Sequence, residues 1–230
     1  MGVVLLVRHG QASFAADDYD VLSETGWAQG RLLGAWLAER DITPTAIVHG
    51  EMRRQRDTAL AMAEGAGWVD VEPDVDPGWD EFDFDFLRAV SAYPDLHGGG
   101  TAELVADRRA FQRVFEAATA RWTGGELGGF IESFSDFRTR VSAALDHATA
   151  SAGPGGTVVV VSSGGPIAVA CAALVDPEGD DPAVTARLWQ RFNTVVVNSS
   201  VSRVVVGSTG ARLLTFNEHP HLEADHLTYR

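Results

Sequence analysis

Short apolar runs alternate along the chain with longer stretches that have helical periodicity. Val3–Val7, Ala46–Val48 and Val158–Val161 are continuous and apolar, a pattern typical of strands buried on both faces of a parallel sheet. Near the end of the chain, Asn198–Val206 and Ala211–Asn217 flank the turn sequence GSTG and predict a β-hairpin. The predicted strands therefore come from both halves of the chain.

Predicted helices follow the first three runs. In residues 22–40, Ser23 is the predicted N-cap. Apolar residues in this stretch recur at three- and four-residue spacing, which predicts an amphipathic helix: Ala28, Leu32, Ala35 and Trp36. Residues 51–67 predict a second helix that ends at glycine, and Pro166 suits the first turn of a helix after the third run.

Strands that alternate with helices predict the fold class. We expect an α/β protein, a three-layer α/β/α sandwich with a mostly parallel central sheet and right-handed crossovers. The middle of the chain differs, because residues 101–122 have a helical pattern and lie between HGGGT and GGELGG. We predict a single domain over residues 1–230 with a helical insertion at about 82–137.

Charge and composition exclude several function classes. The formal net charge is −14, and both nucleic acids and anionic membranes favour basic surfaces, so we expect neither as a partner. Every basic residue is an arginine, which excludes Schiff-base lysines and Walker-type phosphate loops. The one cysteine, Cys171, allows no intrachain disulfide, and no secretory signal is visible, so we predict a cytoplasmic location.

Polar residues follow the predicted strands where their carboxyl ends lie. Residues 8–10 are Arg-His-Gly, residues 49–50 are His-Gly, and residues 162–165 are Ser-Ser-Gly-Gly. In an open α/β sheet, ligands bind outside the carboxyl ends of the strands. A neutral imidazole there can attack phosphorus, arginines can match phosphoryl oxygens, and a carboxylic acid can protonate the leaving alkoxide. The pattern indicates phosphoryl transfer.

Four sequence blocks carry a family resemblance. LVRHGQAS (residues 6–13) resembles the signature of the histidine phosphatase superfamily, the phosphoglycerate mutase-like proteins. GEMRRQRDTA (50–59), WDEFDFD (79–85) and VVVVSSGGPI (158–167) are similar to its later blocks in the same order. The tail from Phe216 looks like that of one branch of the family. The resemblance covers most of the chain apart from the insertion.

The resemblance implies a role for five residues. His9 would be the nucleophile, Arg8 and Arg54 the phosphate clamp, and Glu81 the proton donor. Ser163 stands where the family has a second histidine and would be a weak phosphate contact. A serine donates one neutral hydrogen bond and carries no charge, so the resemblance implies slow or narrow catalysis.

Some assignments have neighbours that compete with them. The register on the second predicted helix leaves Arg53 and Arg56 as alternatives to the clamping arginine, and three aspartates compete with Glu81: Asp80, Asp83 and Asp85. His49 follows a neighbouring strand and is an alternative source of the missing imidazole, although an ordinary loop histidine is the simpler interpretation.

No metal or organic cofactor is expected. His219, His221 and His226 lack the spacing of a helical zinc motif and have no thiolate beside them. The HGGG at residues 97–100 has no Gly-x-Ser-x-Gly elbow to accompany it, so it predicts no esterase.

These observations predict a phosphomonoesterase of low or narrow activity that acts through phosphohistidine on a small phosphorylated substrate. Two alternatives stay open at this point: a binding protein that kept the phosphate pocket and lost turnover, and a phosphomutase. The sequence names neither the substrate nor the oligomeric state, and we expect the specificity elements within residues 82–137.

Overall fold

The computed structural model describes residues 1–13, 20–92, 108–127 and 129–229. The chain divides into two compact units, Met1–Glu81 with Arg140–Arg230, and Phe82–Thr139. We describe each unit by itself. The single domain over 1–230 with an insertion at 82–137 stays a prediction.

The first unit is built on a six-stranded sheet in the order β3-β2-β4-β1-β5-β6. The strands, in chain order, are β1 (Gly2–Arg8), β2 (Ala46–His49), β3 (Asp74–Val75), β4 (Thr157–Ser162), β5 (Val201–Gly207) and β6 (Gly210–Glu218). Strands β3, β2, β4 and β1 are parallel, and the hairpin β5–β6 joins β1 through an antiparallel pair. The predicted mostly parallel sheet is confirmed.

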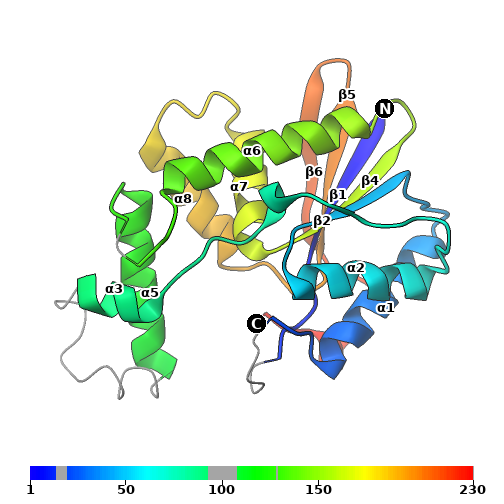
Figure 1. Cartoon of the computed structure of the whole chain (residues 1–230). Helices are drawn as coiled ribbons and strands as arrows, with labels where there is room; N and C mark the ends of the chain where they lie inside the picture. The colour runs from blue at the N-terminus through cyan, green and yellow to red at the C-terminus, as the bar shows by residue number, and fades with distance from the viewer. Residues whose placement is uncertain (14–19, 93–107, 128, 230) are drawn as a thin grey trace. The chain divides into compact units, whose positions relative to one another are not determined.

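Helices lie on both faces of this sheet. The first unit holds α1 (Glu24–Ala38), α2 (Arg53–Ala66), α7 (Gly164–Val175), α8 (Pro182–Asn193), most of α6 (Phe134–Ser151) and the short 3₁₀ helices η1 (Pro77–Trp79) and η3 (Ala224–His226). Helices α1 and α2 cover one face and α7 lies on the other (Figure 1). The three layers predicted from the alternation of strands and helices are confirmed.

The alternation of side chains along each strand explains the layers. Successive side chains of a strand point to opposite faces. Leu5 and Val7 of β1 therefore join a fully buried cluster with Leu33 of α1 and Met62 of α2. Every residue of β1 from Val4 to Val7 is buried, as expected for a strand covered on both faces.

The buried face of α1 contains glycines and a glutamine as well as leucines. Ser23 caps the helix as predicted, because its hydroxyl accepts from the Gly26 N–H at 3.1 Å. Among the apolar residues whose spacing predicted the helix, Trp36 packs against the core at partial burial, whereas Leu32 is 37% exposed. The helix buries a face that contains Gly26, Gln29, Gly30, Leu33, Gly34 and Leu37.

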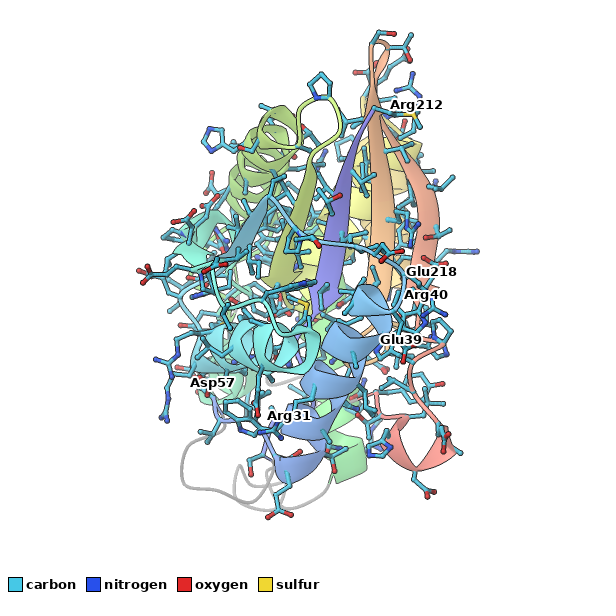
Figure 2. All side chains as sticks on the ribbon, turned by 90° about the vertical axis from the view of Figure 1, so that its right-hand side faces the viewer. Arg31, Glu39, Arg40, Asp57, Arg212 and Glu218 are labelled. Carbon is cyan, nitrogen blue, oxygen red and sulfur yellow. The ribbon has the colours of Figure 1, made fainter. Side chains whose placement is uncertain are left out.

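Glycines decide this face because they allow α1 and α2 to approach closely. A Cβ added at Gly34 would lie 2.0 Å from the Met62 carbonyl oxygen, and one added at Gly30 would lie 2.7 Å from the Cβ of Ala61. At the edge of the contact, Arg31 of α1 (labelled in Figure 2) pairs with Glu64 of α2 at 2.9 Å. Both side chains are about half exposed, so the pair adds little to stability.

Gly34→Ala should destabilise the protein by about 1–3 kcal/mol, because the added methyl forces two helix backbones apart. Without that contact the same change would stabilise an α-helix by up to about 1 kcal/mol, so the sign identifies the cause. Urea unfolding measures the effect. Gly207→Ala is the matched control, since a Cβ there meets nothing within 4 Å. A Gly34→Ala variant as stable as wild type would contradict the close packing.

The C-terminal hairpin begins later than predicted. β5 starts at Val201 instead of Asn198, because Ser199 has a left-handed backbone with φ of 61°. The backbone N–H of Ser199 donates to the carbonyl oxygen of Arg8 at 3.0 Å. Residues 198–200 therefore form a turn against the end of β1 and do not extend the sheet.

The second unit holds α3 (Phe86–Ala92), α5 (Arg108–Thr123) and the start of α6. Aromatic side chains form its core: Trp122 stacks on Phe130 at a centroid distance of 4.2 Å, and Phe82 contacts both rings. The start of the predicted helix at 101–107 and the HGGG at 97–100 lie outside the described residues. Within the described ranges, no helix is long and apolar enough to cross a membrane.

Candidate active site

The ends of β1 and β4 bring two of the predicted blocks together. Arg8 pairs with Ser162 in the parallel register, and the backbone N–H of His9 donates to the Ser162 carbonyl oxygen at 2.8 Å. His49 at the end of β2 pairs with Val161. The three polar strand ends therefore lie at one edge of the sheet, as the parallel arrangement requires.

His9 is held as a neutral imidazole with a defined tautomer. Its Nδ1 lies 2.7 Å from the Gly10 carbonyl oxygen, which only accepts, so the ring proton is on Nδ1. The lone pair is then on Nε2, and the Arg54 Nε–H donates to it at 3.2 Å. Burial, followed by the charges of Arg54 and Arg8, lowers the pKa of His9 well below its ordinary value. Nε2 is therefore the ring nitrogen that carries the free lone pair and faces Arg54.

Arg54 lies in the first turn of α2 and is 8% exposed, whereas Arg53 and Arg56 are exposed. Its Nη1 pairs with Asp20 Oδ1 at 2.7 Å, and Asp20 Oδ2 accepts from the backbone N–H of Arg53 at 2.8 Å. Asp20 thus holds one side of the guanidinium, while the Nε side faces His9.

Thr58 joins the start of α2 to the turn that follows His9. Its hydroxyl donates to the Arg54 carbonyl oxygen at 2.7 Å and accepts from the Gly10 N–H at 2.9 Å. Thr58 is fully buried. The start of α2 and the turn after β1 are therefore fixed to each other through one side chain.

Arg8 bonds to the backbone of the C-terminal region. Its Nη1 donates to the carbonyl oxygens of Val196 and, at 2.9 Å, of Tyr229. The Asn198 backbone N–H donates to the Thr228 carbonyl oxygen at 2.9 Å, and the Asn198 side chain donates to the His9 carbonyl oxygen at 3.2 Å. The last residues of the chain are thereby tied to the strand end that carries Arg8 and His9.

Ser163 occupies the N-cap position of α7 without capping it. Its side chain accepts no hydrogen bond from the first turn of the helix. The hydroxyl oxygen instead accepts from Gln55 Nε2 at 2.9 Å. The adjacent Ser162 donates its hydroxyl to the Trp79 carbonyl oxygen at 2.7 Å. The two neighbouring serines therefore have different partners.

Glu81 lies near the same helix start. Its Oε2 accepts from the Gly165 N–H at 3.1 Å. The carboxylate of Asp80 is used by the loop before α2, where Oδ1 accepts from the Glu51 N–H at 2.6 Å. Burial raises the pKa of Asp80. Asp83 and Asp85 are exposed and belong to the second unit, so Glu81 is the carboxylate that the first unit brings to α7.

His49 and Cys171 have local surroundings that need no ligand. His49 repeats the geometry of His9, with Nδ1 at 2.6 Å from the Gly50 carbonyl oxygen. Burial raises the pKa of the Cys171 thiol to about 12, which makes it a poor nucleophile. In the described part of the chain, no three histidine, cysteine or acidic side chains gather as metal ligands would.

Three residues of the site lay outside the sequence-based prediction. Asp20, Gln55 and Asn198 contact Arg54, Ser163 and His9, respectively. The sequence held a signal for one of them, because Gln55 directly follows Arg54 within the matched block. Asp20 and Asn198 are polar residues next to a helix start and a strand start, where such residues are common, so they carried no comparable signal.

Comparisons with known sequences give one family and no individual curated relative. The sequence model of a protein family, the histidine phosphatase superfamily (branch 1), matches residues 4–219. No curated protein sequence matches the chain.

Similar solved structures include enzymes that act on phosphate esters. Mycobacterial glucosyl-3-phosphoglycerate phosphatase is 23% identical with a TM-score of 0.62, over 94% of this chain and 99% of that one. Phosphoglycerate mutase from Bacillus anthracis is 18% identical with a TM-score of 0.64, over 96% and 94%. Phosphoserine phosphatase from Entamoeba histolytica, in complex with 3-phosphoglyceric acid, is 18% identical with a TM-score of 0.65, over 97% and 100%. Likenesses at these identities establish the fold.

Proposed function

Because the chain belongs to the histidine phosphatase superfamily (branch 1), we propose that it hydrolyses small phosphomonoesters through a phosphohistidine on His9. The solved structures that it resembles include phosphatases, which support hydrolysis, and a phosphoglycerate mutase, so transfer to a second substrate stays an alternative. The proposed reaction requires no metal or organic cofactor. Because a single cysteine allows no intrachain disulfide, we keep the cytoplasm as the proposed location.

One observation carries the proposal. His9 has its proton on Nδ1 and its lone pair on Nε2. The Nε of Arg54 lies 3.2 Å from His9 Nε2 and donates its hydrogen to that lone pair. A phosphoryl group that replaces this hydrogen bond meets a nucleophile on one side and a fixed cation on the other. This is the arrangement that nucleophilic catalysis on a phosphate ester needs.

The first half of the reaction forms the covalent intermediate. His9 Nε2 attacks phosphorus, the bond from phosphorus to the ester oxygen breaks, and Glu81 gives its proton to the leaving alkoxide. Arg54 and Arg8 balance the negative charge on the phosphoryl oxygens while the phosphoryl group is transferred. In the second half, Glu81 takes a proton from water, whose oxygen attacks the phosphohistidine and releases inorganic phosphate and neutral His9.

Two side chains of the proposed site favour a low rate. Ser163 offers a neutral donor, and neutral hydrogen bonds contribute less than charged ones. Asp20 also pairs with Arg54 and offsets part of its charge. Both features lower the stabilisation of a dianionic phosphoryl group and support low or narrow activity.

A binding protein that holds a phosphorylated ligand without turnover is the second candidate. It is favoured by Arg8, whose Nη1 donates to the carbonyl oxygens of Val196 and Tyr229. An arginine that keeps these bonds has fewer N–H groups left to bind the phosphoryl oxygens during transfer. Turnover of any phosphomonoester separates the two candidates.

A phosphohistidine should form at His9 during turnover. A panel of phosphorylated metabolites is screened with His9→Ala as the blank, and the best substrate is quenched without acid for mass spectrometry. We expect a phosphoryl group on the peptide that contains His9 in wild type and none in the variant. Phosphate on another residue, with His9 unmodified during measurable hydrolysis, would contradict the mechanism.

A further inference from the structure

Gln55 lies between the nucleophile's arginine and the unusual serine. It follows Arg54 on α2, it is fully buried, and its Nε2 donates to two acceptors, the Ser163 hydroxyl at 2.9 Å and the Trp79 carbonyl oxygen at 3.2 Å. A buried amide that spans these positions fixes where the Ser163 oxygen lies. The amide orientation follows from its partners, since the carbonyl of Trp79 only accepts.

The bond from Gln55 also decides what the Ser163 hydroxyl can do. A hydroxyl has one proton to donate and lone pairs that accept. Because Gln55 Nε2–H occupies a lone pair, the Ser163 proton must point elsewhere. In the described part of the chain Ser163 is 1% exposed and donates to no side chain or carbonyl, and it caps no helix.

The neighbouring serine shows the contrast. Ser162 is as buried as Ser163 and its hydroxyl proton goes to the Trp79 carbonyl oxygen at 2.7 Å. That bond holds β4 to the turn around η1 and leaves Ser162 no proton for a ligand. Of the two adjacent hydroxyls, the one held by Gln55 is therefore the one with a proton to offer.

We propose that Gln55 is a positioning residue, which orients the Ser163 hydroxyl so that it donates its proton to an oxygen of the phosphoryl group. The inference rests on the proposed function, because it requires a phosphoryl group beside His9. Gln55 itself contacts no substrate atom. It acts through Ser163, and the pair supplies a neutral donor where the family resemblance places an imidazole.

A double-mutant cycle with Gln55→Met and Ser163→Ala tests this dependence. Methionine keeps the length of the side chain and removes the donor, while the Trp79 carbonyl oxygen keeps its bond from Ser162. Each single variant should lower kcat by about three- to tenfold, the range for one neutral hydrogen bond. If Gln55 acts through Ser163, the double variant should be no slower than Ser163→Ala alone.

Ser162→Ala is the matched control. It removes an equally buried hydroxyl from the same turn, and it should lower the melting temperature while kcat stays close to that of wild type. Circular dichroism confirms that each variant folds. Effects on kcat that add in the double variant, or a Gln55→Met variant as fast as wild type, would overturn the positioning role.

The same cycle is repeated on the affinity for inorganic phosphate by calorimetry. If wild type binds phosphate but hydrolyses no ester, the proposed function fails, and non-additive losses of affinity still support the link from Gln55 to Ser163. Additive losses, or no binding of phosphate by wild type, would overturn this inference.

Discussion

Replacing Arg54 by alanine should lower kcat/KM for phosphomonoester hydrolysis by about 10²–10³-fold, the loss that follows removal of one preorganised donor to a developing charge. Arg54 is 8% exposed, and its Nε lies 3.2 Å from Nε2 of His9, the proposed nucleophile. A phosphoryl group on that nitrogen meets the same edge of the guanidinium. Steady-state kinetics on the best substrate of the panel measures the loss.

Arg53→Ala is the matched control, because it removes the same charge from the adjacent, exposed position of α2. Its kcat/KM should stay within a few-fold of wild type, as for an exposed charge. Equal losses from the two variants would contradict the role of Arg54.

The pH profile gives a second readout for Arg54→Ala. The charge of Arg54 contributes to the lowered pKa of His9, so its removal should raise that pKa. A histidine nucleophile is active when neutral, and the acid limb of kcat/KM should therefore move to higher pH. An acid limb that stays in place would show that Arg54 does not act on His9.

Protonation of His221 in acid should lower the free energy of unfolding by about 3 kcal/mol. Burial, followed by the charge of His219, lowers the pKa of His221 from 6.5 to about 4. Between these pH values the unfolded chain binds a proton that the folded chain excludes, so the free energy of unfolding falls as the pH falls. The contribution of neutral His221 to the free energy of unfolding is complete above pH 6.5 and is lost as the pH falls to about 4. His9 acts in the same direction.

Urea unfolding of wild type and His221→Gln at pH 7 and pH 4 measures this contribution. Glutamine does not titrate, so the difference in unfolding free energy between the two proteins should change by about 3 kcal/mol in favour of the variant in acid. His147→Gln, at an exposed position of α6, controls for the loss of an imidazole. Parallel pH dependence of His221→Gln and wild type would contradict the assignment.

The order of strands and helices in the first unit could be predicted from the sequence. Runs such as Val3–Val7 are apolar without interruption, and this pattern belongs to strands covered on both faces. Ser23 marks the start of its helix because a serine side chain readily accepts a capping hydrogen bond. Gly67 marks the end of the next helix because glycine readily adopts a left-handed backbone. Such features are local, so one segment of chain contains all the information.

The residues at the strand ends were also predictable as a group. Parallel strands bring their carboxyl ends to one edge, so the blocks at His9 and Ser163 had to lie near each other. The blocks also carry the family resemblance, and the match to residues 4–219 confirms it. The roles of His9, Arg8, Arg54, Glu81 and Ser163 stay predictions that the experiments above address.

Tertiary structure decided which side of α1 is buried and how each polar group in the site is used. The spacing of apolar residues such as Leu32 predicted an amphipathic helix, and the approach of α2 selected the face with Gly30 and Gly34 for close packing. Close packing depends on the shape of the partner helix, which the sequence of α1 does not contain.

The partners of the charged and hydroxyl groups depend on folding in the same way. Asp20 meets Arg54 and Gln55 meets Ser163 across 34 and 108 residues of sequence, respectively. A hydrogen bond needs two groups at about 3 Å with the right direction, and only the folded chain sets that distance. The sequence by itself determined the fold, and it predicted the kind of chemistry at the strand ends. The tertiary structure decided the tautomer of His9, the arginine that faces it and the amide that holds Ser163.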